Sequence, residues 1–383
     1  MAEIEEFLKK RAEEGSLRQL KPISFRRNAR VRFGMEEFID FCSNDYLGLA
    51  NHPRLILSAR DAMDKFGTSS SASRLLSGDF ELHHRLEKEI AQFKNKESAL
   101  VFNSGYQANI GIISALYSRD DIIFSDRLNH ASIIDGILLS GARFFRFRHN
   151  DSNHLEAILK KERGKYRKAL IVTETIFSMD GDRACLKELA DLRDRYDCQL
   201  MVDEAHATGI YGENGSGVVE EEGLSDRVDL IMGTFSKALG SFGAYLATSR
   251  RVVEYLVNTC RSFIYSTALP PAVIASDLTS IELIREEPYR RLGLLKLAEY
   301  FRTTLKNTGF EIRSTSQIVP VIIGDTVRTV KFAQGLQKKG YWVLPIRPPT
   351  VPQGEARVRF SLTHCHTMPV LQQLINDITT VKV

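Results

Sequence analysis

The sequence predicts an α/β fold with a mostly parallel central sheet covered by helices, followed by a smaller α+β domain. Short, nearly continuous apolar runs alternate with segments of helical spacing between residues 99 and 247, which is typical of buried parallel strands joined by helices. Beyond residue 270 the strand-like runs are accompanied by fewer helices, which indicates a separate unit. A chain of 383 residues is long enough for a large core and an appended domain.

The expected elements follow in chain order. Residues 1–14 predict an amphipathic helix, the basic stretch 17–33 an irregular arm, and residues 38–41 a short strand. Strands are expected at 99–102, 122–125, 144–147, 169–173, 199–202, 230–233 and 244–247, with helices at 106–117, 154–161 and 186–196. A long helical stretch is expected from Pro271 to about residue 307, then strands at 318–323, 341–344 and 357–362, and a final helix from Pro369.

These elements predict three parts. They are an N-terminal arm with its helix at 1–45, a large ligand-binding α/β domain at 46–270, and a linking helix with a small α+β domain at 271–383.

Composition excludes several classes of protein. Apolar residues make up 43% and charged residues 26% of the chain, as in soluble globular proteins. The net charge of +4 is mild and spread along the chain, so no nucleic-acid partner is expected. Five cysteines without a C-x-x-C pair are expected to be reduced thiols. The charged N-terminus is unlike a signal peptide, and no apolar run reaches the roughly 18 residues that span a bilayer, so a cytoplasmic protein without membrane contact is expected.

A lysine after a predicted buried strand is the first candidate for chemistry. Lys237 follows the apolar run 229–234 and precedes a turn with three glycines or serines at 240–243. Ligands bind at the carboxyl ends of strands in α/β sheets, so Lys237 would present its amine to a pocket. A partly buried, neutral amine can form a Schiff base with an aldehyde, which is the chemistry of pyridoxal phosphate. The alternative is a lysine that extends from the strand end into solvent.

The preceding predicted strand ends in a second candidate pair, Asp203 and His206. An aspartate beside a pyridine nitrogen keeps that nitrogen protonated, and a histidine there could bind the phenolic oxygen of the ring. In isolation this spacing is equally typical of a metal pair or of a helix cap with a packed histidine. Because Lys237 follows the next strand, the two strand ends are expected to face one pocket, and the combination favours the cofactor.

Phosphate binding needs N–H groups and hydroxyls at the start of a helix. Ser104 and Gly105 lie between a predicted strand and a predicted helix, and Thr234 and Ser236 supply further hydroxyls beside the lysine. The alternative for the first pair is an ordinary strand–turn–helix with a serine cap.

Two more polar residues follow predicted strands. His130 could stack on a cofactor ring or be a satisfied buried histidine. Ser178 could donate to a ring substituent or cap a turn.

The C-terminal part contains candidate anion-binding arginines. Arg357 and Arg359 alternate on a predicted strand, so one could face inward and hold a carboxylate, whereas a solvent-facing pair is the alternative. Arg347 is expected near the same edge. His364 and His366 resemble a metal pair, but we expect no metal because only these two ligands would lie together.

Seven motifs spread over nearly the whole chain occur in the order found in one enzyme family. They are SNDYLG at 43–48, RLLSG at 74–78, NSGY at 103–106, DEAHATG at 203–209, TFSKALG at 234–240, YSTALP at 265–270 and IRPPTVP at 346–352. The chain thereby resembles the α-oxoamine synthases, a branch of the fold-type I pyridoxal-phosphate transferases. It departs from them in the serine-rich stretch 68–73, where glycines are usual.

The resemblance implies roles for the candidate residues. Lys237 would bind pyridoxal phosphate covalently and move protons at the substrate α-carbon, Asp203 would pair with the ring nitrogen, and His206 with the phenolic oxygen. His130 would stack on the ring, with Ser178 beside it. The implied contacts to cofactor oxygens are Ser104, Gly105, Tyr106, Thr234 and Ser236, with Thr267 reaching the phosphate bound in the neighbouring subunit of a homodimer. The implied substrate-binding residues are Arg18, Asn44, Arg347 and Arg359.

The implied reaction is a decarboxylative condensation of an amino acid with an acyl thioester. The motifs at 74–78 and 346–352 favour the branch that joins L-alanine to a pimeloyl thioester, carried on coenzyme A or a carrier protein. Glycine with an acetyl thioester, and serine or succinyl-thioester use, remain alternatives. A non-catalytic subunit of the same fold would be expected to lack Lys237, and an oxidoreductase with a dinucleotide fold is disfavoured because no G-x-G-x-x-G follows a strand.

Overall fold

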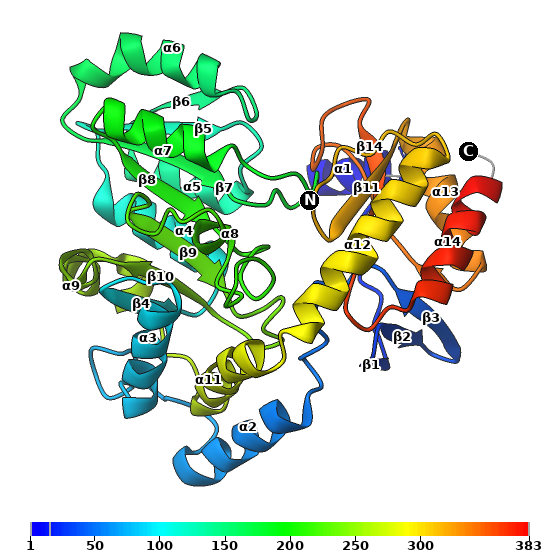
Figure 1. The fold of residues 1–383 in the computed structure, drawn as a ribbon, viewed down its shortest axis with the longest axis horizontal. Helices are drawn as coiled ribbons and strands as arrows, with labels where there is room; N and C mark the ends of the chain where they lie inside the picture. Colours follow the sequence, from blue (N-terminus) through cyan, green and yellow to red (C-terminus); the bar gives the residue numbers. More distant parts are fainter. Residues whose placement is uncertain (1, 15–16, 382–383) are drawn as a thin grey trace. The chain divides into compact units, whose positions relative to one another are not determined.

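The structure, a computed structural model, describes residues 2–14 and 17–381 (Figure 1). Contacts between Cα atoms divide the chain into two units. The small unit contains residues 1–43, 179–181 and 296–383, and the large unit contains residues 44–178 and 182–295. By compactness, therefore, the N-terminal segment belongs with the C-terminal one, and the first half of the predicted linking helix belongs with the large unit.

A seven-stranded sheet forms the centre of the large unit, in the order β4-β10-β9-β8-β7-β5-β6. Its strands are β4 (Ser98–Phe102), β5 (Ile122–Asp126), β6 (Arg143–Phe147), β7 (Ala169–Glu174), β8 (Gln199–Asp203), β9 (Leu230–Thr234) and β10 (Ala244–Thr248). All neighbouring pairs are parallel except those of β10, which runs antiparallel to β4 and β9. The prediction of a mostly parallel sheet is confirmed, and each of its seven predicted strands is present.

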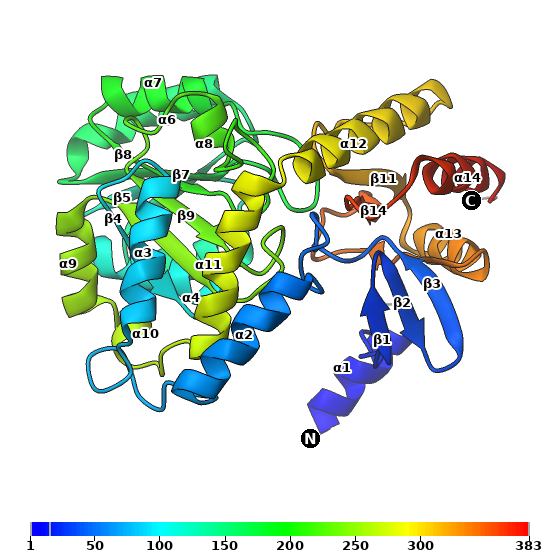
Figure 2. The same ribbon diagram turned by 60° about the horizontal axis from the view of Figure 1, so that its bottom comes forward.

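Helices cover both faces of this sheet. They are α2 (Pro53–Phe66), α3 (Glu81–Phe93), α4 (Gly105–Leu116), α5 (Ala131–Ser140), α6 (Ser152–Glu162), α7 (Leu186–Arg195), α8 (Val218–Glu221), α9 (Arg250–Thr259), α10 (Arg261–Ile264) and α11 (Pro271–Glu286), with a 3-10 turn, η1, at Arg163–Lys165. Helices α6 and α7 lie on one face and α4 lies on the other (Figure 2), where α5 packs against α4.

The alternation of side chains along β8 and β9 determines which of their residues lie on the face that α4 covers. Met201 of β8 and Met232 of β9 belong to the buried cluster that includes residues of α4 and α5. Because alternate side chains of a strand share a face, Asp203 and Thr234, two residues further on, project from this same face at the carboxyl ends. This is the edge at which parallel α/β sheets bind ligands.

Among the described residues, the small unit contains two sheets and four helices. One sheet has the order β1-β2-β3-β12 and the other β11-β14-β13. The strands are β1 (Phe25–Arg27), β2 (Arg30–Phe33), β3 (Glu36–Asp40), β11 (Ile318–Gly324), β12 (Tyr341–Trp342), β13 (Pro345–Ile346) and β14 (Ala356–Ser361), and the helices are α1 (Ala2–Glu13), α12 (Tyr289–Asn307), α13 (Thr326–Lys338) and α14 (Met368–Thr380). Most of α12, from Lys296 onwards, belongs to this unit.

The prediction of an irregular arm at 17–33 is wrong for its second half. β1 and β2 form an antiparallel hairpin, and Val31 is buried. The connecting residues Asn28 and Ala29 have φ values of 49° and 57°, the left-handed conformation that two-residue hairpin loops require. The usual glycine at the second position is absent, which is why the turn was not recognised. The predicted continuous helix to residue 307 is also interrupted, because Pro288 separates α11 from α12.

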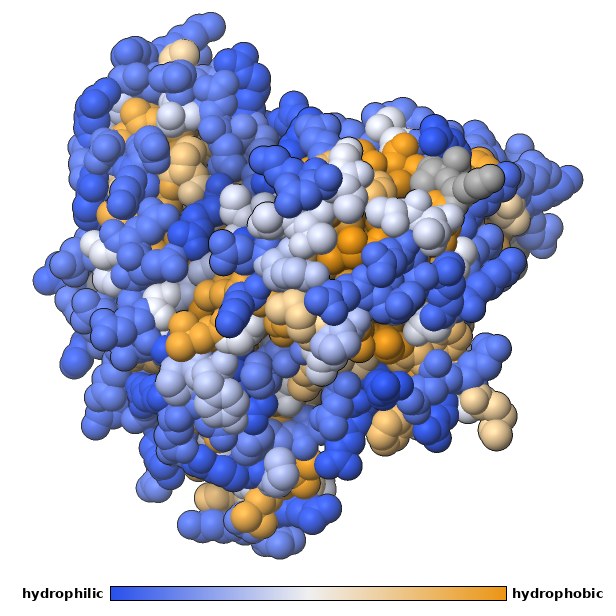
Figure 3. Space-filling model, turned by 45° about the vertical axis from the view of Figure 1, so that its right-hand side comes forward, coloured by the Kyte–Doolittle hydropathy of each residue, from blue (hydrophilic) through white to orange (hydrophobic). Residues whose placement is uncertain are grey.

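Hydrophilic side chains make up most of the molecular face visible in Figure 3. In the described part of the chain, no helix is both long enough and apolar enough to cross a membrane.

Candidate active site

The candidate site lies at the carboxyl ends of β8 and β9 in the large unit. Asp203 is the last residue of β8, and Lys237 follows the end of β9 by three residues. The two strands are parallel neighbours with Asp203 paired to Met232. Lys237 is half-buried and Asp203 is buried. The prediction that these two strand ends adjoin is confirmed.

Asp203 is held in place by a chain of hydrogen bonds that reaches His130. Its Oδ2 accepts a bond of 2.9 Å from Asn109 Nδ2, which also donates to Ser132 Oγ at 2.9 Å. Ser132 Oγ lies 2.8 Å from His130 Nδ1. The second oxygen, Asp203 Oδ1, accepts the backbone N–H of Ala205 at 2.9 Å. Asp203 and His130 were expected from the sequence, whereas Asn109 and Ser132 were not.

His206 belongs to a second chain of hydrogen bonds. Its Nδ1 lies 2.7 Å from the hydroxyl of Tyr46, which donates to Asn44 Oδ1 at 3.1 Å. His206 and Tyr46 are both buried. The structure thus brings the predicted residues Asn44 and His206 together through Tyr46. This tyrosine lies in the SNDYLG motif but had no predicted role.

Glu174 is a carboxylic acid that the sequence reasoning missed. It ends β7 directly beside Asp203 and is buried. Burial and the charge of Asp203 raise the pKa of Glu174 well above its ordinary value, although Lys237 opposes this shift. The Glu-x-x-x-Ser spacing to Ser178 at the end of a buried strand was the available signal.

The start of α4 and the end of β9 form a cradle suited to a phosphate. Ser104 Oγ caps α4 by accepting the N–H of Gln107 at 3.2 Å. A Cβ atom at Gly105 would lie 2.8 Å from Thr234 Cγ2, so only glycine fits this close approach. Within the described residues, the buried hydroxyl of Thr234 has no hydrogen-bond partner. A helix N-terminus beside an unsatisfied hydroxyl fits the phosphate of pyridoxal phosphate.

The other predicted contacts are more exposed. Tyr106 is exposed, and its hydroxyl bonds Asp135, which raises the pKa of Tyr106. Ser236 and Thr267 are exposed, and Ser178 is half-buried in the loop after β7. The carbonyl of Thr267 accepts a bond of 2.8 Å from Asn103 Nδ2.

The predicted substrate arginines all lie in the small unit. Arg18 Nη2 donates to Thr350 Oγ1 at 3.0 Å, and Arg18 and Arg347 line one cavity of about 520 Å³ that has no carboxylate among its lining residues. Burial and the positive charge of Arg18 lower the pKa of Arg347. Arg359 donates to Ser361 Oγ at 2.7 Å.

Two neighbours of these arginines have structural roles. Arg357 is fully buried and bonds Asp180 Oδ1 at 2.5 Å and Glu355 Oε2 at 2.8 Å. His366 stacks on Phe41 with ring centroids 4.2 Å apart, as a packed core histidine.

A buried ion pair supports the segment after Asp203. Lys94 Nζ lies 2.6 Å from Glu204 Oε2, and both side chains are inaccessible to solvent. Lys94 also donates to Thr208 Oγ1 at 3.1 Å and to the carbonyl of Ser216. Burial alone would lower the pKa of Lys94, but the Glu204 carboxylate outweighs it and raises that pKa. The ion pair fixes the turn that contains His206.

We expect Lys94→Met to destabilise the protein by about 3–5 kcal/mol, because it leaves the Glu204 carboxylate buried without its counter-ion. Urea unfolding followed by circular dichroism measures this change. The matched control is Lys88→Met, at an exposed position of the neighbouring helix α3. A loss no larger than that of the control would contradict a structural role of the ion pair.

A model of the aminotransferase class I and II family matches residues 36–378. The chain belongs to this family.

Among the curated relatives of this aminotransferase class I and II protein are two 8-amino-7-oxononanoate synthases. That of Geotalea daltonii is 47% identical over 370 residues, covering 96% of this chain and 94% of its own. That of Geobacter sulfurreducens is 48% identical over 366 residues, covering 95% and 93%. Both matches extend over almost the whole chain.

Solved structures share the fold. A serine palmitoyltransferase from S. paucimobilis, with a bound pyridoxal phosphate–myriocin adduct, is 31% identical with a TM-score of 0.91, covering 99% of this chain and 96% of its own. An 8-amino-7-oxononanoate synthase from Francisella tularensis is 30% identical with a TM-score of 0.77, covering 89% and 97%. The fold-type I transferase architecture implied by the resemblance to α-oxoamine synthases is confirmed.

Proposed function

We propose that the protein is a pyridoxal-phosphate-dependent 8-amino-7-oxononanoate synthase, which condenses L-alanine with a pimeloyl thioester and releases carbon dioxide in biotin synthesis. The observation that carries the proposal is the placement of Lys237, Asp203 and the α4 cradle around one strand edge, in a chain 47% identical to such a synthase over nearly its full length. The cofactor supplies an aldehyde and an electron-accepting ring that stabilises negative charge at the amino-acid α-carbon.

Each residue around the site has a separate role in the proposed reaction. The amine of Lys237 holds the cofactor and moves the proton at the α-carbon. The Asp203 carboxylate, oriented by Asn109, holds a proton on the ring nitrogen. Glu174, whose pKa is raised by burial and by the charge of Asp203, lies beside Asp203 at the same strand edge. His206, oriented by Tyr46, binds the phenolic oxygen, and His130 covers the ring face.

The phosphate and substrate contacts complete the proposal. Ser104, Gly105, Tyr106, Thr234 and Ser236 contact cofactor oxygens, with Ser178 beside the ring. Thr267, being exposed, is available to the phosphate bound in the partner of a homodimer. The carboxylate-free cavity of Arg18 and Arg347 suits an anionic group of the acyl substrate, and Arg359 and Asn44 complete the substrate contacts.

A second candidate is a sister activity with another amino acid and thioester. The serine palmitoyltransferase structures favour it, because their TM-score of 0.91 exceeds the 0.77 of the Francisella tularensis synthase. We give more weight to sequence identity, 47% against 31%, because a TM-score reports backbone placement common to the family and not the side chains that select a substrate.

The test is thiol release from pimeloyl-coenzyme A by the protein supplied with pyridoxal phosphate. We expect release that depends on L-alanine, and none with glycine plus acetyl-coenzyme A or serine plus palmitoyl-coenzyme A. Release with only one of these other pairs would transfer the proposal to the sister activity. Release only from a pimeloyl carrier protein would identify the acyl donor, and no release from any donor would overturn the enzyme assignment.

A further inference from the structure

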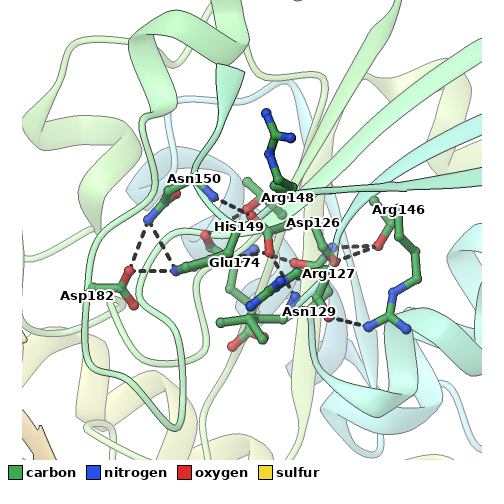
Figure 4. Close-up of polar contacts among 12 residues, drawn as sticks. Asp126, Arg127, Asn129, Arg146, Arg148, His149, Asn150, Glu174 and Asp182 are labelled. Atoms are coloured by element: carbon green, nitrogen blue, oxygen red, sulfur yellow. Dashed lines mark hydrogen bonds and ion pairs between the residues drawn. The ribbon is translucent and has the colours of Figure 1, made fainter. Parts of the chain in front are cut away.

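A polar cluster beside the proposed cofactor site centres on His149, which follows the edge strand β6 (Figure 4). Its Nδ1 lies 3.0 Å from Asp126 Oδ1, at the end of β5, and its Nε2 lies 2.7 Å from Asp182 Oδ2, in the loop after β7. A carboxylate only accepts hydrogen bonds, so both contacts require an N–H on the ring. The geometry therefore selects the doubly protonated, positively charged imidazole.

The two carboxylates belong to segments that contain predicted cofactor contacts. Asp126 begins the segment that ends in His130, and its Oδ1 also accepts the backbone N–H of Leu128 at 2.8 Å. Within this segment Asn129 donates to the carbonyl of Val172 at 2.8 Å, which ties it to β7. Through Asp126, His149 therefore acts on the backbone that presents His130.

Asp182 closes the segment that contains Ser178. The carbonyl of Asp182 accepts the N–H of Phe177 at 3.0 Å, and the ring of Phe177 meets the His149 ring edge-on with centroids 4.4 Å apart. Asn150 Nδ2 adds a bond of 3.0 Å to Asp182 Oδ2. His149 thus contacts both the residue before Ser178 and the residue that closes its loop.

We propose that His149 is a positioning residue for the cofactor site, a cation that bridges Asp126 and Asp182 and so holds the segment of His130 against the segment of Ser178. The inference rests on the proposed function, since it assigns those two residues to the cofactor. Without the imidazolium the two carboxylates would face each other with no counter-charge, and their segments would be joined by the neutral Asn150, which donates to Asp126 Oδ2 and to Asp182 Oδ2 at 3.0 Å each.

The His149 imidazole stays positively charged at neutral pH. Burial alone would lower the pKa of His149, but the hydrogen bonds and charges of Asp126 and Asp182 outweigh it and raise the pKa from 6.5 to about 10. A raised pKa in the folded state stabilises the fold fully below about pH 6.5, and this contribution is lost as the pH rises through about 10.

The first test is a double-mutant cycle read by pyridoxal phosphate affinity, from the visible absorbance of the bound cofactor. We expect His149→Gln and Asp182→Asn each to weaken binding about tenfold, since small displacements of positioning groups cost one to two orders of magnitude. The double variant should be no weaker than either single variant, because both changes break one bridge. His149→Lys, which restores a cation, should recover most of the affinity.

The matched control is His84→Gln on α3, which breaks an exposed contact with Asp79 and should leave the affinity unchanged. In the cofactor-free protein, amide hydrogen exchange should rise in 126–130 and 175–183 of His149→Gln and not elsewhere. Affinity of both single variants within twofold of wild type, or strictly additive losses, would overturn the inference while the proposed function stands. If His149→Gln does not fold, Asp182→Asn alone decides. Wild-type protein that binds no pyridoxal phosphate would overturn both proposals.

Discussion

Lys237→Ala is expected to lower alanine-dependent thiol release by about 10⁴-fold or more, the scale of losing a covalent catalytic group. Two functions disappear together, because the same amine would hold the cofactor and move the α-proton. The variant should fold normally, since Lys237 is only half-buried and lies at a turn. The measurement is steady-state release of coenzyme A, with circular dichroism as the check on folding.

The matched control for this variant is Lys160→Ala. Lys160 is an exposed lysine of α6 that pairs with Glu156 on the surface. It should retain wild-type activity. If Lys237→Ala kept more than a hundredth of the wild-type rate, Lys237 would not be the group that reacts with the cofactor.

Asp203→Asn is expected to reduce turnover by about 10²–10³-fold, the scale of removing one preorganised electrostatic contact from an active site. The substitution removes the charge that would keep the ring nitrogen protonated but preserves the size of the side chain. The new amide can place its oxygen toward either Asn109 Nδ2 or the N–H of Ala205, so the substitution costs the fold at most one of these two hydrogen bonds. We therefore expect a large loss of turnover with little change in the unfolding midpoint.

Asp191→Asn provides the comparison for Asp203→Asn. Asp191 is an exposed carboxylate of α7 paired with Arg227. It should change neither turnover nor stability. A loss of stability in Asp203→Asn that matched its loss of turnover would instead indicate that Asp203 mainly supports the fold.

Sequence reasoning could identify the strands of the large unit and the residues at their ends. Buried parallel strands are continuous apolar runs, so β8 and β9 and the polar residues that follow them are visible in the order of residues. The residues that hydrogen-bond to these polar side chains cannot be read from the sequence. Asn109 lies on α4 and meets Asp203 only because α4 packs on the face from which Asp203 projects. Tyr46 likewise reaches His206 from a distant segment.

The pairing of the N-terminal hairpin was hidden for a different reason. Its strands are short and basic, with the buried Val31 between two arginines, and the turn lacks glycine. What stabilises the hairpin is β3, which pairs with β2 on one side and with β12 on the other. Such long-range pairing leaves no local pattern in the sequence.

That same strand pairing has a consequence for the order in which the protein forms during synthesis. Tyr341 and Trp342 of β12 pair with Ile39 and Asp40 of β3, so the first sheet of the chain is completed by residues translated near its end. The seven-stranded sheet is complete once residue 248 has left the ribosome. Domains generally fold as their residues become available. The edge of β3 therefore stays unpaired in the nascent chain after the sheet that presents Lys237 has assembled.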